Sequence, residues 1–174
     1  MLDSQSGPMA GDVDAFETAA REVNAEVTRT TAGEFDAAME DVLVDPAVGT
    51  PLPYDGVSLP GWVETDPSPS DLAAAATGVT SAGLGVVESG SVVVESAAAG
   101  EDPTSLFPER HVAVLAASDL VADVSAAVEH LAAVAGEGRD AVIETGPSAT
   151  ADMGALVYGA HGPRAVHVVV IEDR

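Results

Sequence analysis

The segment TGPSATADMGALVYGAHGP, residues 145–163, concentrates residue types that bind ligands. Thr145 and the Gly146-Pro147 pair predict a turn, and the run ADMGALVY predicts a helix that Ser148 or Thr150 would cap. If the preceding strand belongs to a parallel sheet, this turn lies at its carboxyl end, directly before a helix N-terminus. Open α/β sheets bind ligands there, and the free N–H groups favour an anion. A capped turn without a ligand is the alternative, and the sequence leaves both open.

The second half of the segment contains polar residues that ending a helix does not require. Asp152 would lie in the first turn of the helix, where the helix dipole stabilises a carboxylate. Gly159 and Pro163 would end the helix. His161 and Arg164 are not needed for that purpose. Because a parallel connection carries the chain to the opposite end of the sheet, we expect these two residues to form an interface or a second site.

Glu88 is the candidate catalytic residue. It follows the apolar run GLGVV and precedes Ser89-Gly90, which predicts the turn of a β-hairpin. Its carboxylate would therefore stand at a sheet end and could act as a nucleophile, although a solvated hairpin carboxylate is the ordinary alternative. The histidines and acids show no recognised ligand spacing, so we predict no metal. Ser148 lacks the G-x-S-x-G setting of an activated serine.

The elements that position these residues follow from hydrophobic periodicity. We predict a disordered N-terminus over residues 1–10, a single α/β domain over 11–174, and a proline-rich excursion or lid at about 51–71. Strands apolar throughout alternate with helices in the C-terminal half, which predicts a mainly parallel sheet with right-handed crossovers. The predicted helices span 12–23, 32–44, 70–77, 120–135 and 151–158, and the predicted strands 26–30, 47–50, 83–88, 91–96, 111–115, 140–145 and 165–172.

Composition limits the class of protein. The chain has 174 residues, of which 47% are hydrophobic and 3% aromatic, so the core must consist of Val, Leu, Ala and Ile. No apolar run is long enough to span a membrane, and the polar, acidic start does not resemble a secretory signal. Cysteine is absent, which excludes disulfides and cysteine-held iron–sulfur clusters in this chain. We therefore predict a cytoplasmic location.

The charge is extreme. The formal net charge is −23, from 29 acidic and 6 basic residues, and all six basic residues are arginines. The carboxylates are spread along the whole chain, so their repulsion opposes a compact state unless salt screens it. We interpret this as adaptation to a halophilic cytoplasm, with a functional acidic surface as the alternative. We predict that neither nucleic acids nor anionic membranes are partners, because binding them requires clustered Lys and Arg.

Three stretches together resemble the LUD-domain family, typified by lactate-utilisation protein C. The run TGPSATADMGALVYGAHGPRAVHVVVI resembles its C-terminal signature, and GVTSAGLGVVESGSVVVES and LFPERHVAVL resemble two upstream motifs. The resemblance covers roughly 70–174, and Gly154 stands where the family commonly has an acid. The matching residues are Gly78, Thr80, Ala82, Glu88, Gly90, Val92, Pro108, His111, Thr145, Gly146, Pro147, Ser148, Thr150, Asp152, Gly159, His161, Gly162, Pro163 and His167.

The resemblance implies a three-layer α/β/α fold like that of the NagB/RpiA/CoA-transferase superfamily. It also implies an accessory part in the oxidation of L-lactate to pyruvate, beside partner proteins that carry iron–sulfur clusters. We expect a small anionic ligand or a partner protein at residues 145–152, and a homo-oligomer is compatible with the sequence. The alternative is a stand-alone isomerase or acyl-CoA transferase that uses Glu88, so the sequence leaves open whether the protein is an enzyme.

The charge predicts salt-dependent folding. In dilute neutral buffer the far-UV circular dichroism spectrum should show loss of the fold, and about 1 M KCl should restore it because the Debye length then falls to about 3 Å. A protein fully folded without added salt at neutral pH would contradict the halophilic interpretation.

Overall fold

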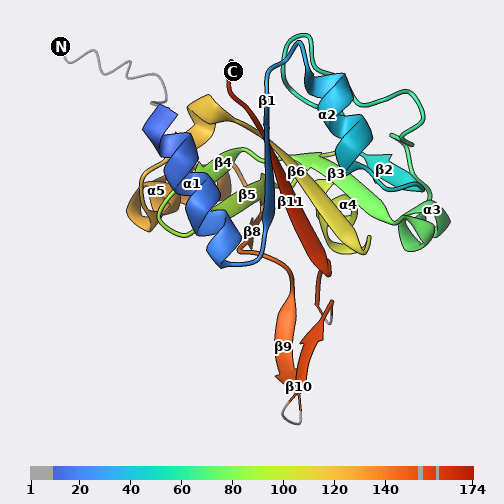
Figure 1. The fold of residues 1–174 in the computed structure, drawn as a ribbon. Coiled ribbons are helices and arrows are strands. Elements are labelled where there is room, and N and C mark those ends of the chain that lie inside the picture. Colours follow the sequence, from blue (N-terminus) through green and yellow to red (C-terminus); the bar gives the residue numbers. More distant parts are fainter. Residues whose placement is uncertain (1–9, 153–154, 160) are drawn as a thin grey trace.

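The central layer is a five-stranded parallel sheet. In this computed structural model, which describes residues 10–152, 155–159 and 161–174, the strand order is β1-β11-β6-β3-β2 (Figure 1). The neighbouring strands pair in parallel throughout, which confirms the predicted mainly parallel sheet. The strands are β1 (Glu26–Thr30), β2 (Ala47–Gly49), β3 (Thr77–Ser81), β6 (Arg110–Ala116) and β11 (Ala165–Ile171).

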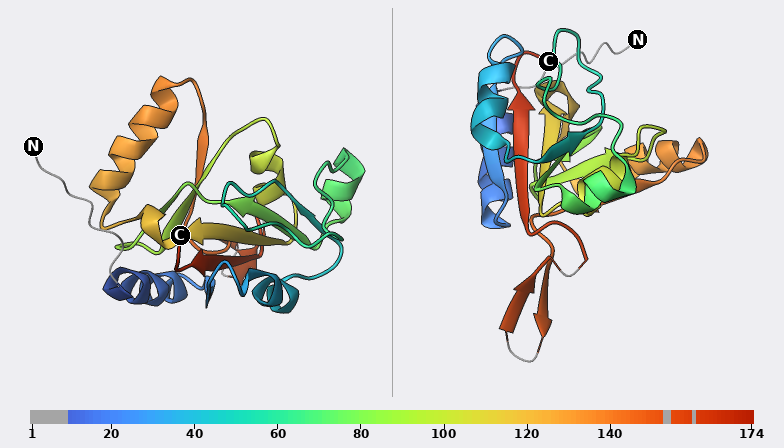
Figure 2. Two further views of the ribbon diagram at one scale, coloured as in Figure 1. Left: turned by 90° about the horizontal axis from the view of Figure 1, so that it is seen from above. Right: turned by 90° about the vertical axis from the view of Figure 1, so that its right-hand side faces the viewer.

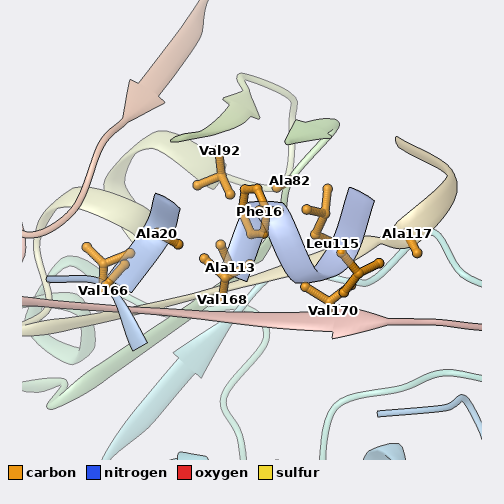
Figure 3. Close-up of a cluster of buried hydrophobic side chains, with 12 residues drawn as sticks. Phe16, Ala20, Ala82, Val92, Ala113, Leu115, Ala117, Val166, Val168 and Val170 are labelled. Atoms are coloured by element: carbon orange, nitrogen blue, oxygen red, sulfur yellow. The ribbon is translucent and has the colours of Figure 1, made fainter. Parts of the chain in front are cut away.

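Helices α1 (Ala10–Glu22) and α2 (Phe35–Val42) cover opposite faces of this sheet. Side chains alternate along each strand, so neighbouring residues of β6 enter different cores. Ala113 and Leu115 pack against Phe16 of α1 (Figure 3), whereas Val112 and Val114 pack with Phe35 of α2. Both cores are mainly aliphatic, as the composition predicts, and each contains one buried phenylalanine.

A second sheet of four strands lies on the α1 side, in the order β7-β4-β5-β8. Strands β4 and β5 form the hairpin predicted at Ser89-Gly90. Val92 of β5 packs in the same core as Phe16, and α5 covers the outer face of the sheet (Figure 2). The bounds are β4 (Leu84–Val86), β5 (Ser91–Glu95), β7 (Leu120–Val121), β8 (Ala141–Glu144) and α5 (Val124–Gly136).

The predicted helix over 151–158 is wrong. The chain forms a two-stranded antiparallel hairpin instead, β9 (Ala149–Asp152) and β10 (Ala155–Tyr158), which projects from the body (Figure 1). Strand β8 is also misplaced by the prediction, because it runs antiparallel to β5 in the second sheet. Periodicity does not show whether a short apolar run forms a helix or a strand. Here residues 149–152 and 155–158 pair with each other as strands.

Two helix starts also differ from the prediction. Helix α3 (Pro69–Ala74) is capped by Ser68 in a capping box with Asp71, and Gly78 lies inside β3 instead of ending the helix. Helix α5 begins after Asp123, whose side chain accepts the Ala126 N–H, because Leu120–Val121 leaves to pair with β4. A further short helix, α4 (Glu101–Leu106), was not predicted.

The proline-rich excursion packs onto the α2 face. The Tyr54 hydroxyl donates to the Val114 carbonyl over 3.1 Å, and Val57 and Leu59 join the core around Phe35. Burial raises the pKa of the Tyr54 hydroxyl. The prediction of disorder for residues 1–10 lies outside the described residues, except that Ala10 begins α1. Within the described part of the chain, no helix is both long and apolar enough to cross a membrane.

Helix α4 approaches β3 closely only because residue 78 is glycine. A Cβ atom at Gly78 would lie 1.9 Å from the Thr104 carbonyl oxygen, whereas one at Gly61 would meet nothing within 4 Å. We therefore expect Gly78→Ala to lower the free energy of unfolding by about 3 kcal/mol, as overpacking does. Urea unfolding in molar KCl measures the loss, with Gly61→Ala as the matched control. Equal stability of the two variants would contradict this packing.

Candidate functional site

A cavity of about 560 Å³ lies where the turn after β8 meets the loop before β11. Pro163 precedes β11 and Leu106 precedes β6, so the cavity lies at the amino-terminal edge of the parallel strands. The prediction of a turn at the carboxyl edge is wrong, because β8 is not a strand of the parallel sheet. The lining residues are Leu106, Val142, Ile143, Glu144, Thr145, Gly146, Pro147, Ser148, Ala149, His161, Gly162 and Pro163.

The two halves of the signature segment meet at Ser148. The Ser148 N–H donates to the Pro163 carbonyl over 2.9 Å, and the Gly159 N–H donates to the Ser148 carbonyl over 2.8 Å. The His161 N–H donates to Ser148 Oγ over 3.3 Å. The expectation that Ser148 and His161 lie at opposite ends of the sheet is therefore wrong. A helix would have carried the chain away, whereas the β9–β10 hairpin brings it back to its starting point.

Gly146 fixes the turn against the end of α1. It is buried with φ of +67°, and a Cβ atom there would lie 2.0 Å from the Val23 carbonyl oxygen. Next to it, the Thr145 hydroxyl bonds Ser91 Oγ over 2.6 Å. Two contacts thus fix the turn: Gly146 packs against the end of α1, and Thr145 bonds Ser91 of β5.

Glu144 lines the cavity and was not among the residues predicted for the site. Its Oε2 forms a short hydrogen bond with Nδ1 of His111, which is fully buried. The other ring nitrogen of His111, Nε2, lies 2.9 Å from the hydroxyl of the buried Thr80. These three residues join the parallel sheet to the second sheet. Glu144 was detectable in the sequence as the acid directly before Thr145-Gly146-Pro147, at the end of a strand.

Glu88 does not line this cavity. Its side chain is exposed in the turn between β4 and β5, and its carboxylate accepts the Val124 N–H at the start of α5 over 3.3 Å. The carboxylate therefore supports a helix N-terminus, which is a structural role. The second candidate site, His161 and Arg164, is divided: His161 lines the cavity, whereas Arg164 is exposed and pairs with Glu109 at 3.9 Å.

Thr150 and Asp152 lie in β9, so the predicted cap and first helical turn do not exist. His167 is buried in β11, with Nε2 2.8 Å from the Thr28 hydroxyl. Burial, helped by Arg110, lowers the pKa of His167. No group of three or more histidine, aspartate or glutamate side chains in the described residues is placed to hold a metal.

All six arginines are engaged by carboxylates. An anion in the cavity would therefore depend on hydroxyl and imidazole groups, because the lining residues that the structure describes include no arginine. The pairs are Arg21–Glu17, Arg29–Glu172, Arg110–Glu26, Arg139–Glu95, Arg164–Glu109 and Arg174–Asp173.

A second hollow, of about 610 Å³, lies at the carboxyl edge of β6 and β11. It is lined by Tyr54, Ser118, Asp119 and Arg174, among others, and burial raises the pKa of Asp119. This is the edge at which α/β sheets usually bind ligands. The segment that suggested a ligand, however, contributes nothing to its lining.

A family model described as the LUD domain matches residues 69–171. The chain belongs to the LUD-domain family. Two curated relatives of this LUD-domain protein, from Deinococcus radiodurans and Shouchella clausii, are both named Lactate utilization protein C. They are 38% identical over 73 and 74 residues, which cover 41% and 40% of this chain. The matched segments cover only 34% and 32% of those relatives, so the chain matches about a third of their length.

A solved structure supports the same assignment. The crystal structure of a DUF162 family protein from Deinococcus radiodurans at 1.70 Å resolution matches with a TM-score of 0.73 and 25% identity. The match covers 94% of this chain and 98% of that one. The predicted family and the predicted α/β class with a mainly parallel sheet are thereby confirmed.

The His111–Glu144 bridge should be important for stability. Replacing His111 by Leu leaves a nearly buried carboxylate without its partner, and we expect it to lower the free energy of unfolding by about 3 kcal/mol. The control is His130→Leu, since His130 forms a partly exposed pair with Glu95 worth at most about 1 kcal/mol. Urea unfolding in molar KCl compares the two variants. Equal losses would show that the buried bridge contributes no more than a surface pair.

Proposed function

We propose that this LUD-domain protein acts in lactate utilisation by binding a small organic acid in the cavity around Ser148. The names of its curated relatives support the process, although the match covers only part of their length. The observation that carries the proposal is that the two halves of the signature segment, Thr145–Ser148 and His161–Pro163, line one cavity. A volume of about 560 Å³ lies within the usual range for ligand pockets and exceeds what a three-carbon acid needs.

The chemistry of the lining suits an acid with an apolar body. Ser148 Oγ already accepts a hydrogen bond from the His161 N–H, so its own proton is available for a ligand oxygen. His161 is exposed and lines the same space, and its ring has no hydrogen-bond partner among the described residues. Leu106, Ile143 and Pro163 supply apolar walls. An acid would place its carboxylate against the hydroxyl and imidazole, and its carbon chain against these walls.

The accessory role follows from the same proposal. Oxidation of lactate releases electrons, and a chain without cysteine has no thiolate to hold an iron–sulfur cluster. Iron–sulfur proteins would therefore act as partners and carry the electrons. The alternative, a stand-alone isomerase or acyl-CoA transferase that uses Glu88, is less well supported because this residue does not line the cavity and its carboxylate accepts the Val124 N–H at the start of α5.

Ligand binding tests the proposal directly. In molar KCl, L-lactate or pyruvate should raise the melting temperature of the protein, and titration calorimetry should give a dissociation constant. Ser148→Ala should weaken binding about tenfold or more, because a hydrogen bond to a charged group is worth about 1.5–3 kcal/mol. Ser125→Ala, on the exposed face of α5, is the matched control and should bind as the wild type does. If neither acid binds, the proposed function is wrong.

A further inference from the structure

We infer that Glu144 presents a fixed hydrogen-bond acceptor to the cavity and thereby selects hydroxy acids over keto acids. The inference rests on the proposed function, because it assigns a ligand class to the same cavity. It arises from one buried chain of contacts, in which Thr80 bonds His111 and His111 bonds Glu144.

The two oxygens of Glu144 have different surroundings. Its side chain is 9% exposed and lines the cavity, and Oε2 is engaged by His111 Nδ1. For Oε1 there is no partner among the residues that the structure describes. Oε1 is therefore the oxygen that remains for a ligand, because a nearly buried carboxylate oxygen requires a hydrogen bond.

Oε1 is an acceptor whenever Glu144 is ionised or carries its proton on Oε2, which covers three arrangements of the protons. If the Thr80 hydroxyl donates to Nε2, the neutral ring carries its proton on Nδ1 and donates it to Oε2 of an ionised Glu144. If Nε2 donates to Thr80 instead, the neutral ring accepts at Nδ1, and the Glu144 proton lies on Oε2. A doubly protonated ring donates to both partners. In each arrangement Oε1 has no proton, so the cavity meets an acceptor.

His111 is the positioning residue for this acceptor. Its ring is fully buried and held at both nitrogens, and it lies on β6 next to β3, where Gly78 is its register partner. The ring cannot turn without losing both hydrogen bonds. The Glu144 carboxylate therefore cannot rotate freely to swap the positions of Oε1 and Oε2, and Oε1 stays in one position.

A fixed acceptor discriminates between ligands that differ at a single oxygen. The hydroxyl of a 2-hydroxy acid donates to Oε1. The carbonyl oxygen of a 2-keto acid is itself an acceptor, so it cannot bond Oε1 and is repelled by it. Sites built to bond a ligand hydroxyl strongly reject analogues that lack it, because a buried polar group is then left unpaired. We expect affinity to fall from L-lactate to propanoate, which has no oxygen at that carbon, and to be lowest for pyruvate.

The test is to titrate the wild-type protein in molar KCl with L-lactate, propanoate and pyruvate in turn. NMR or calorimetry measures the dissociation constant of each acid. L-lactate should bind at least tenfold more tightly than pyruvate. Equal binding of the two, or tighter binding of pyruvate, would overturn the inference and leave the proposed function standing. If none of the acids binds, the proposed function fails, and this inference fails with it.

Variants show whether a residue controls the preference for lactate over pyruvate or the affinity for both acids. Glu144→Leu should bring the lactate-to-pyruvate ratio close to one, whereas Ser148→Ala should weaken both acids and leave the ratio above tenfold. His111→Asn keeps a side-chain group near the position of Nδ1 and should retain much of the ratio that His111→Leu loses. A ratio unchanged in Glu144→Leu would overturn the inference. Where that variant fails to fold, the wild-type ratio decides.

Discussion

The hydrogen-bonded chain from Thr80 through His111 to Glu144 is the interaction on which the site depends. It is a buried polar link between the parallel sheet and the smaller mixed sheet. Burying these groups is favourable only while each has its partner, so the bridge constrains how β8 lies against β6. Strand β8 in turn leads into the Gly146 turn. The cavity is therefore connected through Glu144 to the fully buried ring of His111.

The β9–β10 hairpin is the second constraint, because it brings Ser148 and His161 together. The β9–β10 hairpin leaves the body at Ser148 and returns near His161, and backbone hydrogen bonds join its two ends. The residues that line the cavity thus come from a strand end, a turn and a returning loop. They meet at the amino-terminal edge of the parallel sheet, whereas most open α/β sheets bind ligands at the carboxyl edge. The arrangement follows from the second sheet, which diverts the chain between β6 and β11.

The charged residues differ between the cavity and the rest of the molecule. Each arginine already pairs with a carboxylate, so the excess acid is left for solvent and salt to screen. An acid bound in the cavity would meet Ser148 and His161, and no arginine among the lining residues that the structure describes. Its recognition would then depend on short-range hydrogen bonds more than on charge.

Local sequence patterns are enough to predict the family, the α/β class, the parallel pairing of the β6 and β11 regions and the β4–β5 hairpin. These features depend on local patterns: continuous apolar strands, a Ser-Gly turn and a specific run of motif residues. Only the tertiary structure decided that residues 149–158 form strands, that β8 joins another sheet, and that Glu144 meets His111. Those outcomes depend on which distant segment pairs with each strand, and a short apolar run is compatible with either a helix or a strand until its neighbours are present.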